Sequence, residues 1–287
     1  MIKEMRLIYP VLLLCRVLEV TTSGYYAWIK RPFSIRKREE ERLALEIQAA
    51  HKRTRQTYGP ERLQQDLSEN GVVVGVHRIK RIRRKLGLRC LQKRKFKATT
   101  NSRHSLPVAE NLLDQRFEAS APNQVWLTDL TYVSTAEGWL YLAGHKDLFT
   151  GEIVGYSMGE RMTKHLVIES LQRALAAKCP SPGLIHHSDR GSQYCALEYG
   201  SLLNRFGARA SMSRKGNCYD NAPMESFWGV LKSELIYHCR YETRQEAIRD
   251  ITEYIEIFYN RQRKQARLGY LSPAAFERCF YEKSMAA

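Results

Sequence analysis

Three carboxylates, Asp129, Asp189 and Glu225, have the residue types and the surroundings of a divalent-metal site. Asp129 lies inside an apolar, β-forming run, where a carboxylate is costly unless it is paired or bound to a cation. Asp189 ends a short apolar run just before a glycine turn, and Glu225 opens an expected helix. Oxygen ligands from separate elements, without a nearby thiol, favour Mg²⁺ or Mn²⁺ over zinc.

The chemistry that such a site performs is displacement at phosphorus. Two ions about 3.5–4 Å apart would activate the attacking oxygen and stabilise the leaving one. His186 and His187 leave a zinc site open as an alternative. Neighbours on a strand face opposite ways, so we expect one of these histidines in the core and the other at the site. A hydrolase triad of His187, Ser188 and Asp189 is disfavoured, because three consecutive residues cannot converge.

Three further acids are expected to have structural positions. Asp147 ends a predicted strand and is expected to cap a turn. Asp220 belongs to a polar loop and is expected to be a helix N-cap. Glu234 lies late on a helix and is expected to be exposed. None of the three is therefore assigned to the site.

The elements that must position the site acids form an α/β pattern. Alternating apolar and polar residues predict three strands joined by short turns, and then two more strands separated by helices. This order predicts a mixed five-stranded sheet with helices on both faces, its first strand central and its fourth beside it. The predicted strands are residues 125–133, 138–149, 152–158, 184–188 and 208–212, and the predicted helices are residues 163–178, 196–206, 222–236 and 244–259.

The first third of the sequence is predicted to be helical. Residues 9–31 form either a small helix-turn-helix or an aromatic-packed hairpin, and helices follow at residues 35–51, 61–69 and 76–86. The last helix carries cations opposite an apolar stripe. This pattern is typical of a helix that enters a DNA major groove, although a solvated face has the same composition. The cations are Arg78, Lys80, Arg81, Arg83, Arg84 and Lys85.

The positive charge of the chain is concentrated in the same region. Residues 1–104 contain 25 Lys and Arg against 9 Asp and Glu, whereas residues 105–287 contain 21 of each kind. This asymmetry predicts a polyanion-binding module attached to a neutral body. The basic linker at residues 89–104 is expected either to follow a phosphate backbone or to be a plain tether.

The composition disfavours other classes of protein. The seven cysteines include no CxxC pair, which favours reduced structural thiols over a zinc site or a disulfide framework. The apolar run at residues 9–15 is too short for a signal peptide or a membrane span. We therefore expect a soluble, intracellular protein.

Several motifs, in their order and spacing, resemble a known family. Thirty-five residues separate Asp189 from Glu225, and Lys232 follows Glu225 by seven positions. This D-D-35-E pattern resembles the retroviral-integrase-like catalytic core and, more narrowly, the second-frame (OrfB) protein of IS-three family insertion-sequence transposases. The resemblance covers nearly the whole chain. The motifs that carry it are Thr57-Tyr58-Gly59, Trp126-Leu127-Thr128-Asp129-Leu130-Thr131-Tyr132, His187-Ser188-Asp189-Arg190-Gly191-Ser192-Gln193-Tyr194, Asn221-Ala222-Pro223-Met224-Glu225-Ser226-Phe227 and Leu268-Gly269-Tyr270-Leu271-Ser272-Pro273.

The resemblance implies an enzyme, a DDE transposase with an RNase H-like fold. Asp129, Asp189 and Glu225 would hold two Mg²⁺ ions, for which Mn²⁺ could substitute. Water would cleave a phosphodiester at the element's end, and the freed 3′-hydroxyl would attack a second DNA strand. The result is DNA integration and recombination by hydrolysis and transesterification. The resemblance also implies active-site or DNA contacts by Lys232, Gln193, Tyr194, Asn217 and Asn221.

Partners, location and domain division follow from the same resemblance. The implied partners are double-stranded DNA at element ends and target, further copies of the chain on that DNA, and the first-frame (OrfA) protein, separate or joined by frameshift fusion. The implied location is the bacterial cytoplasm, at the nucleoid. The predicted parts are an N-terminal helical segment (1–34), a helix-turn-helix DNA-binding domain (35–88), a basic linker (89–117) and a catalytic domain with a helical tail (118–287).

Two features depart from the family pattern. Gln265 stands where the tail often carries a histidine, so no role is assigned to it. The chain also lacks the separate helix-turn-helix and leucine zipper of the first frame, so we expect it to cleave poorly alone. Two alternatives stay open: a DNA-binding regulator with an inert nuclease-like domain, and a nuclease that cleaves without joining. The intact acids argue against the first, and the basic helix-turn-helix argues against the second.

Overall fold

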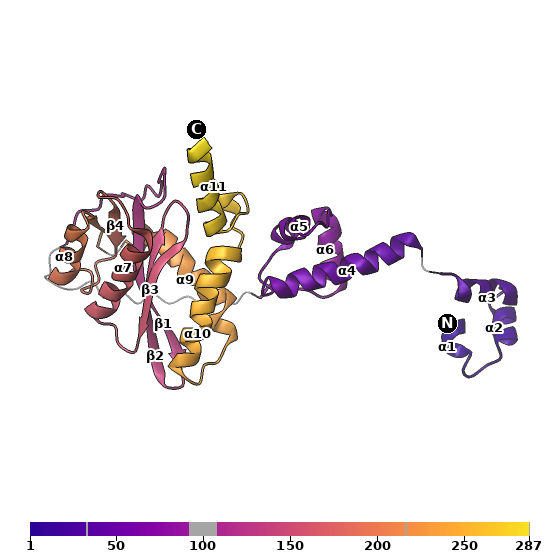
Figure 1. The fold of residues 1–287 in the computed structure, drawn as a ribbon. Coiled ribbons are helices and arrows are strands. Elements are labelled where there is room, and N and C mark those ends of the chain that lie inside the picture. The colour runs from indigo at the N-terminus through magenta and orange to yellow at the C-terminus, as the bar shows by residue number, and fades with distance from the viewer. Residues whose placement is uncertain (33, 92–107, 216, 287) are drawn as a thin grey trace.

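The N-terminal helices lie apart from the rest of the chain (Figure 1). The structure is a computed structural model that describes residues 1–32, 34–91, 108–215 and 217–286. Its first three helices are α1 (Ile2–Met5), α2 (Val11–Val17) and α3 (Thr22–Lys30). The predicted pair of helices in residues 9–31 is therefore confirmed. The residues of the basic linker at 92–104 lie outside the described part of the chain.

A three-helix unit follows, as the sequence pattern predicts. It consists of α4 (Ile35–Arg53), α5 (Pro60–Glu69) and α6 (Val76–Lys85). Each helix turns its apolar stripe toward the other two, which removes those side chains from water. The buried residues are Leu43, Ile47, Leu63, Leu67, Ile79 and Ile82.

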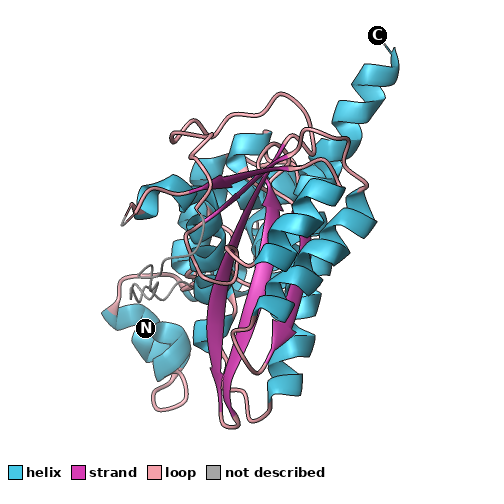
Figure 2. Cartoon of the chain, turned by 90° about the vertical axis from the view of Figure 1, so that its left-hand side faces the viewer, coloured by secondary structure: helices cyan, strands magenta, loops and turns pink. Residues whose placement is uncertain are grey.

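Residues 125–212 contain a mixed five-stranded sheet, as predicted, with helices packed around it (Figure 2). The strands β1 (Val125–Thr135), β2 (Gly138–Asp147) and β3 (Ile153–Gly159) are antiparallel neighbours. The strands β4 (Ile185–Ser188) and β5 (Arg209–Met212) run parallel to β1, in the order β3-β2-β1-β4-β5. The first strand is therefore central, and the fourth lies directly beside it.

Helices cover both faces of the sheet because neighbouring residues on β1 point to opposite sides. Trp126 belongs to the apolar cluster shared with α7 (Lys164–Lys178) and α8 (Leu197–Arg205). Leu127, the next residue, belongs to the cluster shared with α9 (Ala222–Glu234) and α10 (Arg244–Glu253).

The helix predicted at residues 244–259 is present, but only its first part, α10, is an α-helix. The chain continues without a break as a π-helix, η3 (Tyr254–Gln262), and the last helix is α11 (Pro273–Ala286), for which the sequence pattern predicted no bounds. The inward side of η3 is largely aromatic and buried. We therefore attribute the π-helical conformation to side-chain packing rather than to local helix propensity. No helix among the described residues is long and apolar enough to span a membrane.

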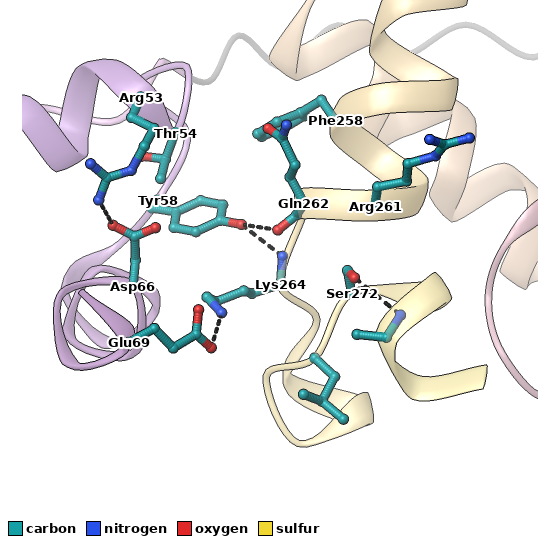
Figure 3. Close-up of a pocket in the computed structure, with 12 residues that line it drawn as sticks. Arg53, Thr54, Tyr58, Asp66, Glu69, Phe258, Arg261, Gln262, Lys264 and Ser272 are labelled. Carbon is teal, nitrogen blue, oxygen red and sulfur yellow. Dashed lines mark hydrogen bonds and ion pairs between the residues drawn. The ribbon is translucent and has the colours of Figure 1, made fainter. Parts of the chain in front are cut away.

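The three-helix unit is docked on this C-terminal region through Tyr58 (Figure 3). The buried Tyr58 hydroxyl donates to the carbonyl oxygen of Gln262 (3.1 Å) and accepts from the backbone N–H of Lys264 (2.7 Å). Ion pairs between Lys264 and Glu69 and between Arg55 and Glu253 flank this contact. A cavity of about 360 Å³ lies in the same junction. The Thr57-Tyr58-Gly59 motif thus joins two parts of the chain.

Candidate functional site

The first two acids lie on neighbouring parallel strands: Asp129 is inside β1, and Asp189 directly follows β4. β1 and β4 are parallel, with Leu127 opposite His187, and Asp129 and Asp189 each lie two residues further on. The third acid, Glu225, lies in the first turn of α9, which packs against β1. Three separate elements therefore carry the three acids toward one region.

The electrostatic surroundings of Asp129 show that the three acids are close. Burial, together with the charges of Asp189 and Glu225, raises the pKa of Asp129 to about 8. Two hydrogen bonds act in the opposite direction: Oδ1 accepts from Leu130 N (2.8 Å), and Oδ2 accepts from Trp228 Nε1 (3.1 Å). A negative charge on Asp129 is thus energetically costly when no cation neutralises it.

The fit of a cation can be tested on these surroundings. Among the described residues, no three His, Cys, Asp or Glu side chains already converge closely enough to enclose an ion. The acids nevertheless supply only oxygen donors, and their mutual repulsion is the kind that a hard cation relieves. Asp189 is oriented by the backbone of its own turn, because its Oδ1 accepts from Gly191 N (2.9 Å). The residues present therefore fit Mg²⁺ or Mn²⁺.

Two buried polar residues tie α9 to the sheet: Asn221, which is expected from the resemblance to be an active-site or DNA contact, and Lys146, which is not predicted from sequence. Asn221 Nδ2 donates to the carbonyl oxygen of Thr128 (3.0 Å), next to Asp129. Lys146 Nζ donates to the carbonyl oxygen of Pro223 (2.9 Å), two residues before Glu225, and burial lowers the pKa of Lys146 to about 7. Lys146 had no sequence signal, because a lysine in an alternating strand is expected to be exposed.

Lys232 faces the acids from α9. Its Nζ lies 5.2 Å from the ring centroid of Tyr132, a cation–π distance. Burial lowers the pKa of Lys232, and the charge of Asp129 acts in the opposite direction, which shows that the two groups are near each other. A helix rises one and a half ångströms per residue, so Glu225 and Lys232, seven residues apart, lie about two turns apart on one face.

The remaining residues expected to contact DNA near the acids differ in exposure. Gln193 is half-buried, and its Nε2 donates to the carbonyl oxygen of Met162 (3.4 Å). Asn217 Oδ1 accepts from Tyr219 N (3.1 Å) at the start of η1 (Cys218–Asn221). Tyr194 is buried, and its hydroxyl accepts from Thr128 Oγ1 (3.4 Å), so its side chain is not on the surface.

The basic helix α6 presents most of its cations to solvent. Lys80, Arg81, Arg84 and Lys85 are exposed, and Arg78 is half-buried. Arg83 is the exception, because its side chain is buried and donates to Cys90 Sγ (3.3 Å).

Glu40 on α4 forms ion pairs with two of the exposed cations of α6. Its carboxylate lies 3.3 Å from Arg81 Nη2 and 3.2 Å from Lys85 Nζ. The hydrogen bond and the charge of Lys85 are the main reasons that the pKa of Glu40 is lowered. An acid therefore lies against the part of α6 expected to meet DNA.

Three acids were predicted to have structural positions, and one of these predictions is confirmed while two are wrong. Asp147 caps a turn as predicted, because Thr150 N and Oγ1 both donate to it. Asp220 is not the N-cap of α9. It is buried and forms an ion pair with Arg214 (2.8 Å). Glu234 is buried rather than exposed, because Arg263 lies 2.7 Å away and Tyr254 donates to it.

Both histidines of β4 are buried, so the expectation that one of them lines the site is wrong. His186 lies against His145 (3.1 Å) and the Tyr199 hydroxyl (3.2 Å), and His187 contacts Ser211 (2.8 Å). Burial lowers the pKa of His186 to about 3 and that of His187 to about 4, so both are neutral. Their hydrogen bonds hold the sheet beneath the acids.

Comparison with known proteins gives matches along most of the chain. Two models described as integrase core domain match residues 119–218 and 225–279, and a model described as HTH-like domain matches residues 37–96.

Two relatives match over almost their whole length. The chain is 61% identical over 269 residues to an uncharacterized 31 kDa protein of insertion element IS600 from Shigella sonnei, which covers 94% of this chain and 99% of the relative. It is 43% identical over 266 residues to transposase InsF for insertion sequence IS3A from Escherichia coli (strain K12), which covers 92% of each. Among solved structures, the HTLV-2 integrase catalytic core domain in complex with magnesium matches with a TM-score of 0.45 at 15% identity, over 56% of this chain and 99% of that one.

Proposed function

The chain belongs to the insertion-sequence transposases of the IS3 InsF type, and on that premise we propose that Asp129, Asp189 and Glu225 are the acids with which it cleaves and joins DNA. One observation carries this proposal. Burial and the charges of the other two acids raise the pKa of Asp129 to about 8, so ionising Asp129 is costly unless a counterion is bound. A divalent cation would supply that counterion, and Mg²⁺, as two ions, or Mn²⁺ in its place fits the oxygen donors.

Each acid has a distinct place in this mechanism. When bound there, divalent cations would supply the positive charge that activates a hydroxyl nucleophile and stabilises a leaving oxygen. Asp129 lies within β1 and Asp189 directly follows the parallel neighbour β4, so the pairing of these strands would hold the two acids at a fixed separation. Glu225 is exposed and completes the set from the side that is open to DNA. Lys232, on the same face of α9, would hold a phosphate of the terminal nucleotides.

DNA binding is proposed for the helix-turn-helix part of the chain, residues 35–88. The exposed cations of α6 would meet phosphates and base edges in a major groove, and Gln193 and Asn217 would add contacts near the acids. Arg83 and Tyr194, which are buried, are left out of this proposal. The DNA-facing cations of α6 are Arg78, Lys80, Arg81, Arg84 and Lys85.

The division of labour along the chain is part of the same proposal. In this proposal, residues 1–34 precede the DNA-binding part at 35–88. The linker at 89–117 joins that part to the catalytic region at 118–287. Transposition needs two element ends in one complex, so we expect several copies of the chain to assemble on DNA. The first-frame protein, separate or fused by frameshifting, is the expected additional partner.

The experiment follows both chemical steps on one substrate. Purified protein is incubated with Mg²⁺ and a labelled duplex that carries one end of the encoding insertion element, and the cleaved and joined products are separated. Because the chain is expected to cleave poorly alone, the first-frame protein is added to each incubation, and we expect the wild type to form both products and Asp189→Asn to form neither. Equal joined product from both proteins would refute the assignment. Cleavage without joining by the wild type would instead identify a nuclease, and binding without cleavage would identify a regulator.

A further inference from the structure

The indole of Trp228 contacts one of the three site acids directly. Trp228 is buried, and its Nε1 donates to Asp129 Oδ2 at 3.1 Å, while Leu130 N donates to Oδ1 of the same carboxylate at 2.8 Å. Each carboxylate oxygen therefore has one fixed donor. A carboxylate oxygen that accepts one hydrogen bond keeps a further lone pair with which it can bind a cation.

The indole that reaches Asp129 packs closely against residue 144, which lacks a side chain. Gly144 is the direct cross-strand partner of Asp129, so a side chain there would stand on the same face of the sheet. A Cβ atom built on Gly144 would lie 3.0 Å from Trp228 Cη2 and 3.1 Å from Met224 Cε. The space that Gly144 leaves is thus filled by the ring that holds Asp129.

The same helix carries both this donor and the third acid. Trp228 follows Glu225 by three residues on α9, so the two side chains lie about one turn apart. An indole N–H is a donor only, which means that it orients the carboxylate without competing for a cation. Partners of this kind fix the direction of a ligand and its affinity for metal.

We propose that Trp228 is a positioning residue, which holds the Asp129 carboxylate ready for a divalent cation and links its orientation to the position of Glu225. Gly144 is the second part of this arrangement, because it admits the indole. The inference rests on the function proposed above, in which Asp129 is a metal ligand.

The test measures Mn²⁺ binding to the full chain without DNA, from the electron paramagnetic resonance signal of free Mn²⁺. Trp228→Phe keeps the ring and removes the N–H. We expect it to raise the Kd for Mn²⁺ about tenfold, the lower end of the effect of losing such a partner. The matched control is Trp126→Phe, which removes another buried indole donor, one that bonds Asn123 Oδ1 (3.2 Å) on the opposite face, and should leave the Kd unchanged.

The outcomes separate this inference from the proposed function. Asp129→Asn is measured in parallel, and a Kd equal to that of the wild type would refute the proposed site itself. If Asp129→Asn weakens binding but Trp228→Phe does not, only the role of Trp228 is refuted. An equal loss in Trp126→Phe would also refute it, because general packing would then be the cause. Gly144→Ala, which crowds the indole without removing it, should weaken binding in the same direction and serves if Trp228→Phe does not fold.

Discussion

Replacing Asp129 by Asn should make the metal-free protein more stable at alkaline pH, although it should abolish activity. Burial and two neighbouring acids raise the pKa of Asp129 to about 8 from its ordinary 3.8. The folded protein therefore binds a proton that the unfolded chain releases above pH 4. Folding stability consequently falls as the pH rises from the lower pKa to the higher one. An Asn side chain has no proton to lose and escapes this penalty.

The size of the effect follows from linkage. One such group changes the free energy of unfolding by up to about 1.4 kcal/mol per pH unit, which sets a ceiling of about 4 kcal/mol between pH 5 and pH 8. Asp129 is only half-buried, so water relieves part of the cost. We expect the difference between Asp129→Asn and the wild type to grow by about 2 kcal/mol over this range.

The assay is urea denaturation in EDTA at half-unit steps from pH 5 to pH 8. The exposed Asp114→Asn is the control, and its curve should run parallel to that of the wild type. Saturating Mg²⁺ at 100 times its Kd should then stabilise the wild type by about 2.7 kcal/mol and leave Asp129→Asn unchanged. Parallel pH curves for Asp129→Asn and the wild type would refute the electrostatic account of the site.

Three further predictions concern docking and DNA contacts. Tyr58→Phe leaves Gln262 O and Lys264 N without their buried partner and should lower the free energy of unfolding by about 1–3 kcal/mol in urea titrations, whereas the exposed Tyr219→Phe should not. Glu40→Gln frees two cations of α6 and should tighten DNA binding, steepening the plot of log Kd against log salt by about 1; an unchanged slope would contradict this. Lys232→Ala should reduce joining about tenfold while end binding persists, and Lys232→Arg should retain most of the activity.

The sequence predicted the sheet well because its signals are local. Alternation of apolar and polar residues along 125–133 is enough to identify β1, and an acid in that run is conspicuous because it breaks the apolar side. The order of strands and helices then limits the topology to a mixed sheet with β1 central. The 35-residue spacing between Asp189 and Glu225 then supported the hypothesis that these two acids and Asp129 form one site.

The errors concern residues whose partners are distant or depend on packing. Glu234 was expected to be exposed because nothing near it in sequence shows that Arg263, 29 positions later, neutralises it. The role of Tyr58 in docking was missed for the same reason, since its partners lie about 200 residues away. Trp228 and Gly144 could be linked only after the register of β1 and β2 was known. Tertiary contacts of this kind produce no periodic pattern of apolar and polar residues from which they could be predicted.

The most direct test of the central claim, that Asp129, Asp189 and Glu225 act as one site, is a rate measurement on element-end DNA. Asp129→Asn, Asp189→Asn and Glu225→Gln are compared with the wild type and with Asp114→Asn in Mg²⁺, after DNA binding has been measured for each. We predict that all three site variants bind the end normally and lose cleavage and joining by at least about a thousandfold, while Asp114→Asn keeps both. A site variant that still cleaves within tenfold of the wild type would contradict the account.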